Sequence, residues 1–172
     1  PPALQADLGA IQRNSQHLAR LVDDVLDLSQ VEAGRMALSK EQVSLMTIFE
    51  SASAAVHPLF ATKKLTLSAE VPDDLPPLYC DSTRIRQVLI NLLSNAGRFT
   101  EQGGVTVRAW QEAAQVVVSV TDTGPGIPRA SQARLFEPFQ QLDGSIRRRY
   151  GGSGLGLSIS KHFVELHGGR MW

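Results

Sequence analysis

Two glycine-rich segments are the strongest chemical signal in this chain of 172 residues. One, Asp122-Thr123-Gly124-Pro125-Gly126, ends an apolar strand, and the other, Gly151-Gly152-Ser153-Gly154-Leu155-Gly156-Leu157, begins an apolar helix. Because glycine has no Cβ, backbone N–H groups in such segments can approach a phosphate closely, and a helix N-terminus adds partial positive charge. A carboxylate would repel phosphates, so we expect Asp122 to accept a hydrogen bond from an exocyclic amine such as that of adenine. Together the segments predict a nucleotide pocket.

Each glycine run has a simpler interpretation when it is taken alone. The segment from Asp122 to Gly126 could be an ordinary turn, since Asp, Gly and Pro are common turn residues. Gly154-Leu155-Gly156 is a spacing that recurs by chance, and a Walker loop is excluded because no Gly-Lys-Ser or Gly-Lys-Thr follows. The order of the segments favours the nucleotide hypothesis: an asparagine-bearing helix, a strand ending in Asp122 and a glycine turn, then a glycine-led helix.

The asparagine-bearing helix lies upstream of both runs. Asp81-Ser82 can cap it, and its core face follows the helical spacing i, i+3, i+4, i+7, i+8 through Ile85, Val88, Leu89, Leu92 and Leu93. Asn91 and Asn95 are one turn apart on the flank of that stripe and could simply face solvent. Neutral amide oxygens nevertheless suit Mg²⁺, which relies on substrate phosphates to complete its shell. Arg98 lies close to the same face and could meet phosphate oxygens.

A long polar segment separates the two glycine runs. It follows Leu135-Phe136-Glu137-Pro138-Phe139, whose aromatic residues are more often core anchors than ligands. Residues 140–150 are many for a connection without secondary structure, and such loops are often lids. The three arginines at 147–149 either form a solvated face, clamp charge beside a phosphate or contact a partner domain.

Composition sets outer limits. The 17 Lys and Arg residues equal the 17 Asp and Glu residues, so the charge balance does not point to nucleic acid. A single cysteine, Cys80, excludes an internal disulfide framework and suits a reducing compartment. No run approaches the roughly 18 apolar residues of a membrane span, and we expect a cytoplasmic protein whose parent could be anchored upstream. Each of the four histidines lacks a neighbouring ligand set, so we expect surface or capping roles for them.

The remaining elements follow from periodicity. Apolar residues at alternating steps of three and four predict a long helix from Leu4 to Val31, which ends at Glu32-Ala33-Gly34 and needs a partner helix. We expect this helix to project from its own domain. A second helix is predicted from Met46 to Ala61, broken near Pro58. Alternation predicts a strand at 65–71 and a hairpin of strands at 105–108 and 116–120.

These segments, in this order, resemble the catalytic ATP-binding domain of bacterial sensor histidine kinases, of the GHKL (Bergerat) type. Four segments are similar to the family's N box, first glycine box, F box and second glycine box: Asn91–Ala96, Asp122–Gly126, Phe136–Phe139 and Gly152–Leu157. Residues 11–34 resemble the second helix of the family's dimerisation and phosphotransfer hairpin. The resemblance implies an α+β fold, a two-layer α/β sandwich with a mixed, mostly antiparallel sheet and a long N-terminal helix. It divides the chain into residues 1–34, part of the hairpin, and residues 35–172, a catalytic domain that we expect to be truncated at its C-terminal end.

The resemblance also implies roles for single residues. Asp122 would read the adenine amine in a base pocket shaped by Gly126 and Ile127, and Asn95 would hold Mg²⁺ with Asn91 beside it. Arg98 occupies a place where the family commonly has lysine, and Gln141 a place where some members carry an arginine toward the γ-phosphate. With Asn91, these two are the expected catalytic residues. The expected ATP contacts are Asn91, Asn95, Arg98, Asp122, Gly124, Gly126, Ile127, Phe136, Gly152, Ser153, Gly154, Leu155 and Gly156.

The implied activity is transfer of the γ-phosphoryl group of Mg-ATP to a histidine, and from there to an aspartate of a response-regulator receiver domain. We expect the acceptor histidine on the first hairpin helix, outside this chain, because no His-acid motif precedes Leu4 and His17 does not replace it. The parent protein is expected to be a homodimer. Two alternatives stay open: a GHKL ATPase of the gyrase or chaperone kind, whose relatives have a glutamate in the place of Asn91, and an ATP-responsive binding module without kinase activity.

Overall fold

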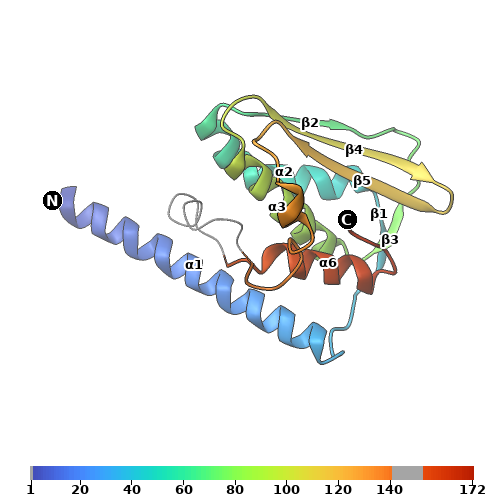
Figure 1. Ribbon diagram of the computed structural model, residues 1–172, viewed down its shortest axis with the longest axis horizontal. Helices are drawn as coiled ribbons and strands as arrows, with labels where there is room; N and C mark the ends of the chain where they lie inside the picture. Colours follow the sequence, from blue (N-terminus) through green and yellow to red (C-terminus); the bar gives the residue numbers. More distant parts are fainter. Residues whose placement is uncertain (1, 141–152) are drawn as a thin grey trace.

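A computed structural model describes residues 2–140 and 153–172 as two layers beside a long helix (Figure 1). The upper layer in this view is a sheet of β2 (Thr66–Glu70), β4 (Gly104–Glu112) and β5 (Gln115–Asp122). Below it lie α2 (Leu45–Lys63) and α3 (Ser82–Phe99), and α6 (Gly156–Leu166) packs against α3. The long helix α1 (Pro2–Glu32) contacts α6, and its N-terminal part extends away from the other elements.

The described strands form two sheets. In the larger one, β4 pairs antiparallel with β5 and parallel with β2. In the smaller one, β1 (Glu41–Val43) pairs antiparallel with β3 (Leu78–Cys80). The predicted α+β class and the mixed, mostly antiparallel pairing are therefore confirmed, as is the predicted hairpin, in which Val105 lies opposite Asp122. A short helical turn, α4 (Arg129–Gln132), follows β5.

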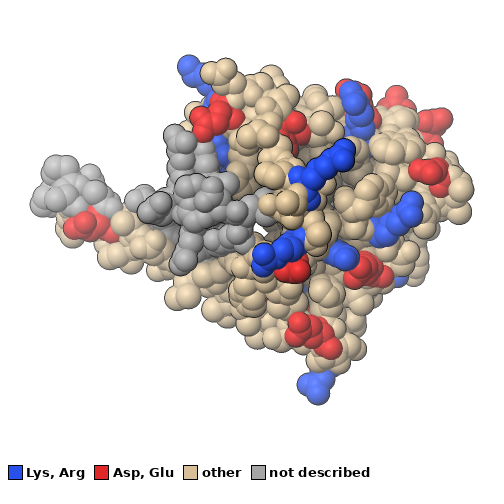
Figure 2. All heavy atoms as spheres, viewed as in Figure 1, with Lys and Arg blue, Asp and Glu red and all other residues tan. Residues whose placement is uncertain are grey.

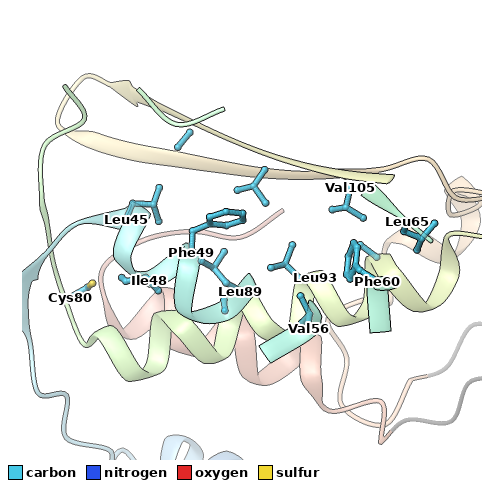
Figure 3. Packing of buried hydrophobic residues seen from close by; sticks show 14 residues of the cluster. Leu45, Ile48, Phe49, Val56, Phe60, Leu65, Cys80, Leu89, Leu93 and Val105 are labelled. Carbon is cyan, nitrogen blue, oxygen red and sulfur yellow. The ribbon is translucent and has the colours of Figure 1, made fainter. Parts of the chain in front are cut away.

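The main hydrophobic core fills the space between the larger sheet and the helices α2 and α3 (Figure 3). From β4, the alternate residues Val105, Val107 and Ala109 are buried, as the strand period of two requires. From α3, Leu89 and Leu93 face them on the predicted apolar stripe. Because this core fixes α3 against β4, it also fixes the position of Asp122 at the end of the neighbouring strand.

The prediction that the second helix breaks near Pro58 is wrong. α2 continues from Leu45 to Lys63 with Pro58 inside it. Proline removes one hydrogen bond, to the carbonyl of Ala54, but Ala54 and Pro58 are both exposed, so water can solvate that carbonyl. Ala52, Val56 and Phe60 are buried on the opposite face, and their burial outweighs the local cost.

The N-terminus of α3 is held by the predicted cap. Asp81 Oδ1 accepts a hydrogen bond from the Arg84 N–H at 3.1 Å, and Oδ2 accepts one from the Ser39 N–H at 2.9 Å. Burial alone would raise the pKa of the Asp81 carboxyl, but these N–H donors and the Arg84 charge hold that pKa below its usual range. The Asp81 N–H donates to His167 Nε2 at 2.9 Å, and His167 is the C-cap residue of α6. His167 therefore has the capping role that the sequence predicted.

A second apolar cluster joins the C-terminal end of α1 to α3 and α6. Leu28 of α1 packs with four buried residues of α3 and α6 or their flanks, Val88, Leu155, Ile159 and Phe163. Asp27 beside it pairs with Arg84 at 3.1 Å. Before Leu28, apolar residues along most of α1 are exposed: Leu4, Leu8, Ile11, Leu18, Val22 and Val25. The helix thus does not project over its whole length as predicted, because near its C-terminal end Asp27 and Leu28 contact α3 and α6. None of the helices in the described residues combines the length and hydrophobicity that crossing a membrane requires.

Candidate nucleotide site

The helix α3 connects the two parts of the candidate site. At Asn91 it meets the N-terminal end of α6, where the Asn91 Nδ2 donates to Ser160 Oγ at 2.8 Å. A Cβ built on Gly156 would overlap the Asn91 side chain, so only glycine allows α6 to begin this close to α3. The asparagine-bearing helix and the glycine-led helix, which are far apart in the sequence, are therefore in direct contact.

Asn95 and Arg98 follow on the next turns of α3, and both are half-buried. The Asn95 amide has no hydrogen-bond partner among residues 2–140 and 153–172, so its oxygen is available as a neutral, hard ligand. In the same described residues, no group of three His, Cys, Asp or Glu side chains could hold a metal ion. The donor set at this site is therefore one of amides, and it fits a cation that brings phosphate oxygens with it.

At the C-terminal end of α3 lies the turn that contains Asp122. Asp122 is exposed, and its Oδ1 accepts a hydrogen bond from the Gly124 N–H at 2.7 Å. Its Oδ2 has no partner in the described part of the chain, so one oxygen orders the turn while the other can receive a ligand donor. Gly124 lies against the last residue of α3, since a Cβ there would be 3.2 Å from the Phe99 carbonyl oxygen.

Gly126 and Ile127, which we expected to shape a base pocket, follow this turn. Both are exposed, and the Ile127 carbonyl accepts a hydrogen bond from Gln132 Nε2 at 2.9 Å. That bond ties the turn to α4. Their expected contact with a base stays a prediction.

Thr123 is a site residue that sequence reasoning did not single out. Its Oγ1 donates to the Gln102 carbonyl at 2.8 Å and accepts from the Gly104 N–H at 3.1 Å. These two bonds fasten the Asp122 turn to the loop between α3 and β4. The one sequence signal for this role is its position between Asp122 and Gly124, since threonine occurs in many turns without such a role.

The segment Phe136–Phe139 and the second glycine run are in contact, at the two ends of the expected lid. The Phe139 N–H donates to the Gly154 carbonyl at 3.0 Å, and the Lys161 Nζ lies 5.3 Å from the centre of the Phe136 ring. Gln141, Gly152 and the arginines at 147–149 lie outside the described residues. Phe139 and Gly154, on either side of the polar segment that contains these residues, are thus in direct contact.

Ser153 and Leu155 have packing contacts in addition to their expected ligand roles. Leu155 is 1% exposed in the second apolar cluster. Ser153 Oγ donates to Asp24 Oδ2 of α1 at 3.1 Å and accepts from the Leu155 N–H at 3.2 Å. Their contacts with a nucleotide stay predictions, but both residues also link α1 to the segment that begins α6.

Comparison with known families agrees with this geometry. Residues 80–172, more than half of the chain, match the family model of histidine kinase-, DNA gyrase B- and HSP90-like ATPases. The chain belongs to this ATPase family. The match begins just before α3 and includes the asparagine helix, the Asp122 turn and α6.

Similar proteins narrow the resemblance to one branch of the ATPase family. The chain is 46% identical over 168 residues to the circadian input-output histidine kinase CikA of Synechococcus elongatus, with 94% of the chain and 22% of the relative covered. It is 38% identical over 169 residues to the sensory/regulatory protein RpfC of Xanthomonas campestris, with 94% and 23% covered. The chain therefore spans less than a quarter of the length of these curated relatives.

Solved structures of histidine kinases share the fold. Full-length ShkA in complex with AMPPNP superposes with a TM-score of 0.82 and 33% identity, over 94% of this chain and 33% of that one. ThkA in complex with the response regulator TrrA gives a TM-score of 0.69 and 25% identity, over 92% and 44%. The resemblance to the catalytic ATP-binding domain of sensor histidine kinases is thus confirmed, and with it the GHKL fold.

Proposed function

We propose that this chain is the ATP-binding catalytic part of a two-component histidine kinase, which binds Mg-ATP and supplies its γ-phosphoryl group to a histidine outside these 172 residues. One observation carries the proposal: α3 makes two contacts. Its last residue, Phe99, lies against Gly124 of the Asp122 turn, and its Asn91 lies against Gly156 at the start of α6. A base-reading carboxylate and a phosphate-binding helix N-terminus are thereby held on one rigid element. Residues 1–34 would complete a phosphotransfer hairpin, and residues 35–172 would bind the nucleotide.

Each predicted residue then has a defined task. The exposed Asp122 Oδ2 accepts the adenine amine, while Oδ1 keeps the turn ordered through the Gly124 N–H. The N-terminal end of α6 receives phosphate oxygens, and Arg98 adds a positive charge near them. Asn95 would hold Mg²⁺, which when bound neutralises charge on the phosphates. The protein's own contribution is positioning.

The Asn91 side chain favours a kinase over the ATPase alternative. An amide is not a general base, and its Nδ2 already donates to Ser160 Oγ. The described site therefore offers no group at this position that could activate water. We accordingly propose phosphoryl transfer to an acceptor on another segment.

The proposed partners follow from the same assignment. ShkA was solved with AMPPNP and ThkA with a response regulator, which supports ATP and a receiver domain as partners here. The exposed apolar residues of α1, such as Leu8, Ile11 and Leu18, suit a helical partner and thus a homodimeric parent. We propose that this parent acts in the cytoplasm.

Replacing Asp122 tests the nucleotide site. Asp122→Asn keeps an oxygen for the Gly124 N–H but loses the charge, so the affinity for ADP should fall roughly 10- to 100-fold. The measurement is isothermal titration calorimetry of the purified chain. Asp74→Asn, at an exposed loop position, removes the same charge elsewhere and should leave the affinity unchanged. An unchanged affinity in Asp122→Asn would refute the base-reading role.

A further inference from the structure

The C-terminal end of α3 is held by an ammonium group from another helix. Lys63 Nζ donates to the carbonyl oxygens of Gly97, Arg98 and Thr100, at 2.9, 2.6 and 2.9 Å. Carbonyls at the end of a helix have no partner within that helix, and they carry its partial negative charge. An ammonium has three N–H donors, so one side chain satisfies this group of acceptors.

Lys63 reaches these carbonyls because α2 and α3 approach closely at this point. A Cβ built on Gly97 would lie 2.8 Å from Cε2 of Phe60, so the helices can come this near only at a glycine. α2 ends directly afterwards at its C-cap residue Lys64, which is exposed and has φ +56°. The Lys63 side chain is half-buried between the two helix ends.

The end of α3 in turn supports the Asp122 turn. The Phe99 carbonyl lies against Gly124, and the Thr123 hydroxyl donates to the Gln102 carbonyl just beyond α3. Residues 97–104 are therefore held by Lys63 on one side and contact the Asp122 turn on the other. A displacement of this helix end would move both Asn95 and Asp122 relative to a bound nucleotide.

We infer that Lys63 is a positioning residue of the nucleotide site: it fixes the last turn of α3 and thereby sets the geometry of the Asp122 turn for an adenine nucleotide. The inference rests on the proposed function, because it assumes that Asp122 and α3 bind ADP or ATP. Without the ammonium, the three carbonyls must turn to water. The last turn of α3 then opens more often, and the turn packed on it loses its support.

The test compares two adjacent lysines. Lys63→Met keeps the aliphatic stem and removes the ammonium. The affinity for ADP should fall about tenfold, the equivalent of about one hydrogen bond lost in the nucleotide complex. Lys64→Met removes the same charge at a neighbouring exposed position and should bind ADP as the wild type does. Calorimetry is done at a temperature where circular dichroism shows every variant to be folded.

A second measurement separates positioning from a general loss of stability. Hydrogen exchange should accelerate in Lys63→Met at residues 97–104 and 122–126, while exchange in α6 stays as in the wild type. Ile48→Val lowers stability at the far end of α2, in the main core, and should keep both the ADP affinity and the exchange of residues 122–126. If Ile48→Val weakens ADP binding as much as Lys63→Met, the positioning role is refuted.

The possible results distinguish the inference from the proposed function. Failure of the wild-type chain to bind ADP would overturn the proposed function. Wild-type binding together with equal binding by Lys63→Met would overturn only the role of Lys63. If Lys63→Met does not fold, Lys63→Gln, which keeps N–H donors but lacks the reach, should show the same loss of affinity, and unaltered binding by that variant would overturn the inference.

Discussion

At the scale of one residue, Thr100 at the end of α3 combines a hydrogen-bonded backbone with a buried hydroxyl that lacks a partner in the described residues. Its side chain is fully buried, with 0% exposed surface, and its Oγ1 has no hydrogen-bond partner in the part of the chain that the structure describes. Its carbonyl, in contrast, accepts from Lys63, and its N–H donates to the Ala96 carbonyl at 2.9 Å. The backbone of this residue is therefore satisfied while its hydroxyl is buried at a cost.

Replacement of that hydroxyl by a methyl group should stabilise the protein. Thr100→Val keeps the shape and removes an unsatisfied polar atom, so the free energy of unfolding should rise by about 1 kcal/mol, measured by urea denaturation. Thr47→Val, at an exposed position of α2, is the matched control and should stay within about 0.5 kcal/mol of the wild type. A clear loss of stability in Thr100→Val would show that the hydroxyl has a partner.

At the scale of elements, the contact of α1 with α3 and α6 is the junction between the two proposed parts of the chain. Asp27 pairs with Arg84 at 3.1 Å and accepts a hydrogen bond from Gln87 Nε2 at 3.2 Å. The Arg84 guanidinium also lies 5.0 Å from the centre of the Phe163 ring. One arginine thus links α1, α3 and α6 beside the buried Leu28.

Removing the charge of Asp27 should loosen α1. The side chains of Arg84 and Asp27 are 25% and 14% exposed, so the pair lies between the surface and buried limits, and Asp27→Asn should lower the free energy of unfolding by about 1–2 kcal/mol. Hydrogen exchange should rise most in the C-terminal half of α1. Asp23→Asn, exposed on the same helix, should have little effect. Equal stabilities of the two variants would show that the pair does not hold α1.

At the scale of the whole molecule, positive and negative side chains are equal in number. The face in Figure 2 shows Lys and Arg interspersed with Asp and Glu, and the formal net charge of the sequence is zero. The proposed recognition of ATP would therefore depend on local groups such as Asp122 and the α6 N-terminus rather than on an overall field. Binding of the proposed helical partner would likewise depend on local groups, the exposed apolar residues of α1, rather than on overall charge.

The chain by itself should bind nucleotide without phosphorylating a histidine. Incubation with radiolabelled Mg-ATP should yield no acid-labile, base-stable phosphate, because the acceptor is proposed to lie on a helix outside these residues. Binding of ADP by the same sample, measured by calorimetry, is the control for a folded site. Labelling that disappears in His17→Ala would contradict this prediction and place the acceptor on α1.

Much of the fold was predicted from the sequence alone, because the signals are local, while the roles of the site residues stay predictions. Periods of 3.6 and 2 residues predicted α1, α3 and the β4–β5 hairpin, and Asp81 was correctly predicted as a cap. The order of four segments, Asn91–Ala96, Asp122–Gly126, Phe136–Phe139 and Gly152–Leu157, predicted the family, which was confirmed. Pro58 was misread because its helix-breaking tendency is also local, whereas the burial that overrides it is not.

Only the tertiary structure decided how these segments support one another. Lys63 and Thr100 are 37 residues apart, and Asp24 and Ser153 are 129 apart, so no sequence period links them. A lysine at the end of a helix or a serine in a glycine run has the same local pattern whether or not it has a distant partner. The sequence by itself determined which residues carry groups able to do chemistry. Packing decided which other residues hold those groups in place, because contacts between distant residues depend on how whole helices approach one another.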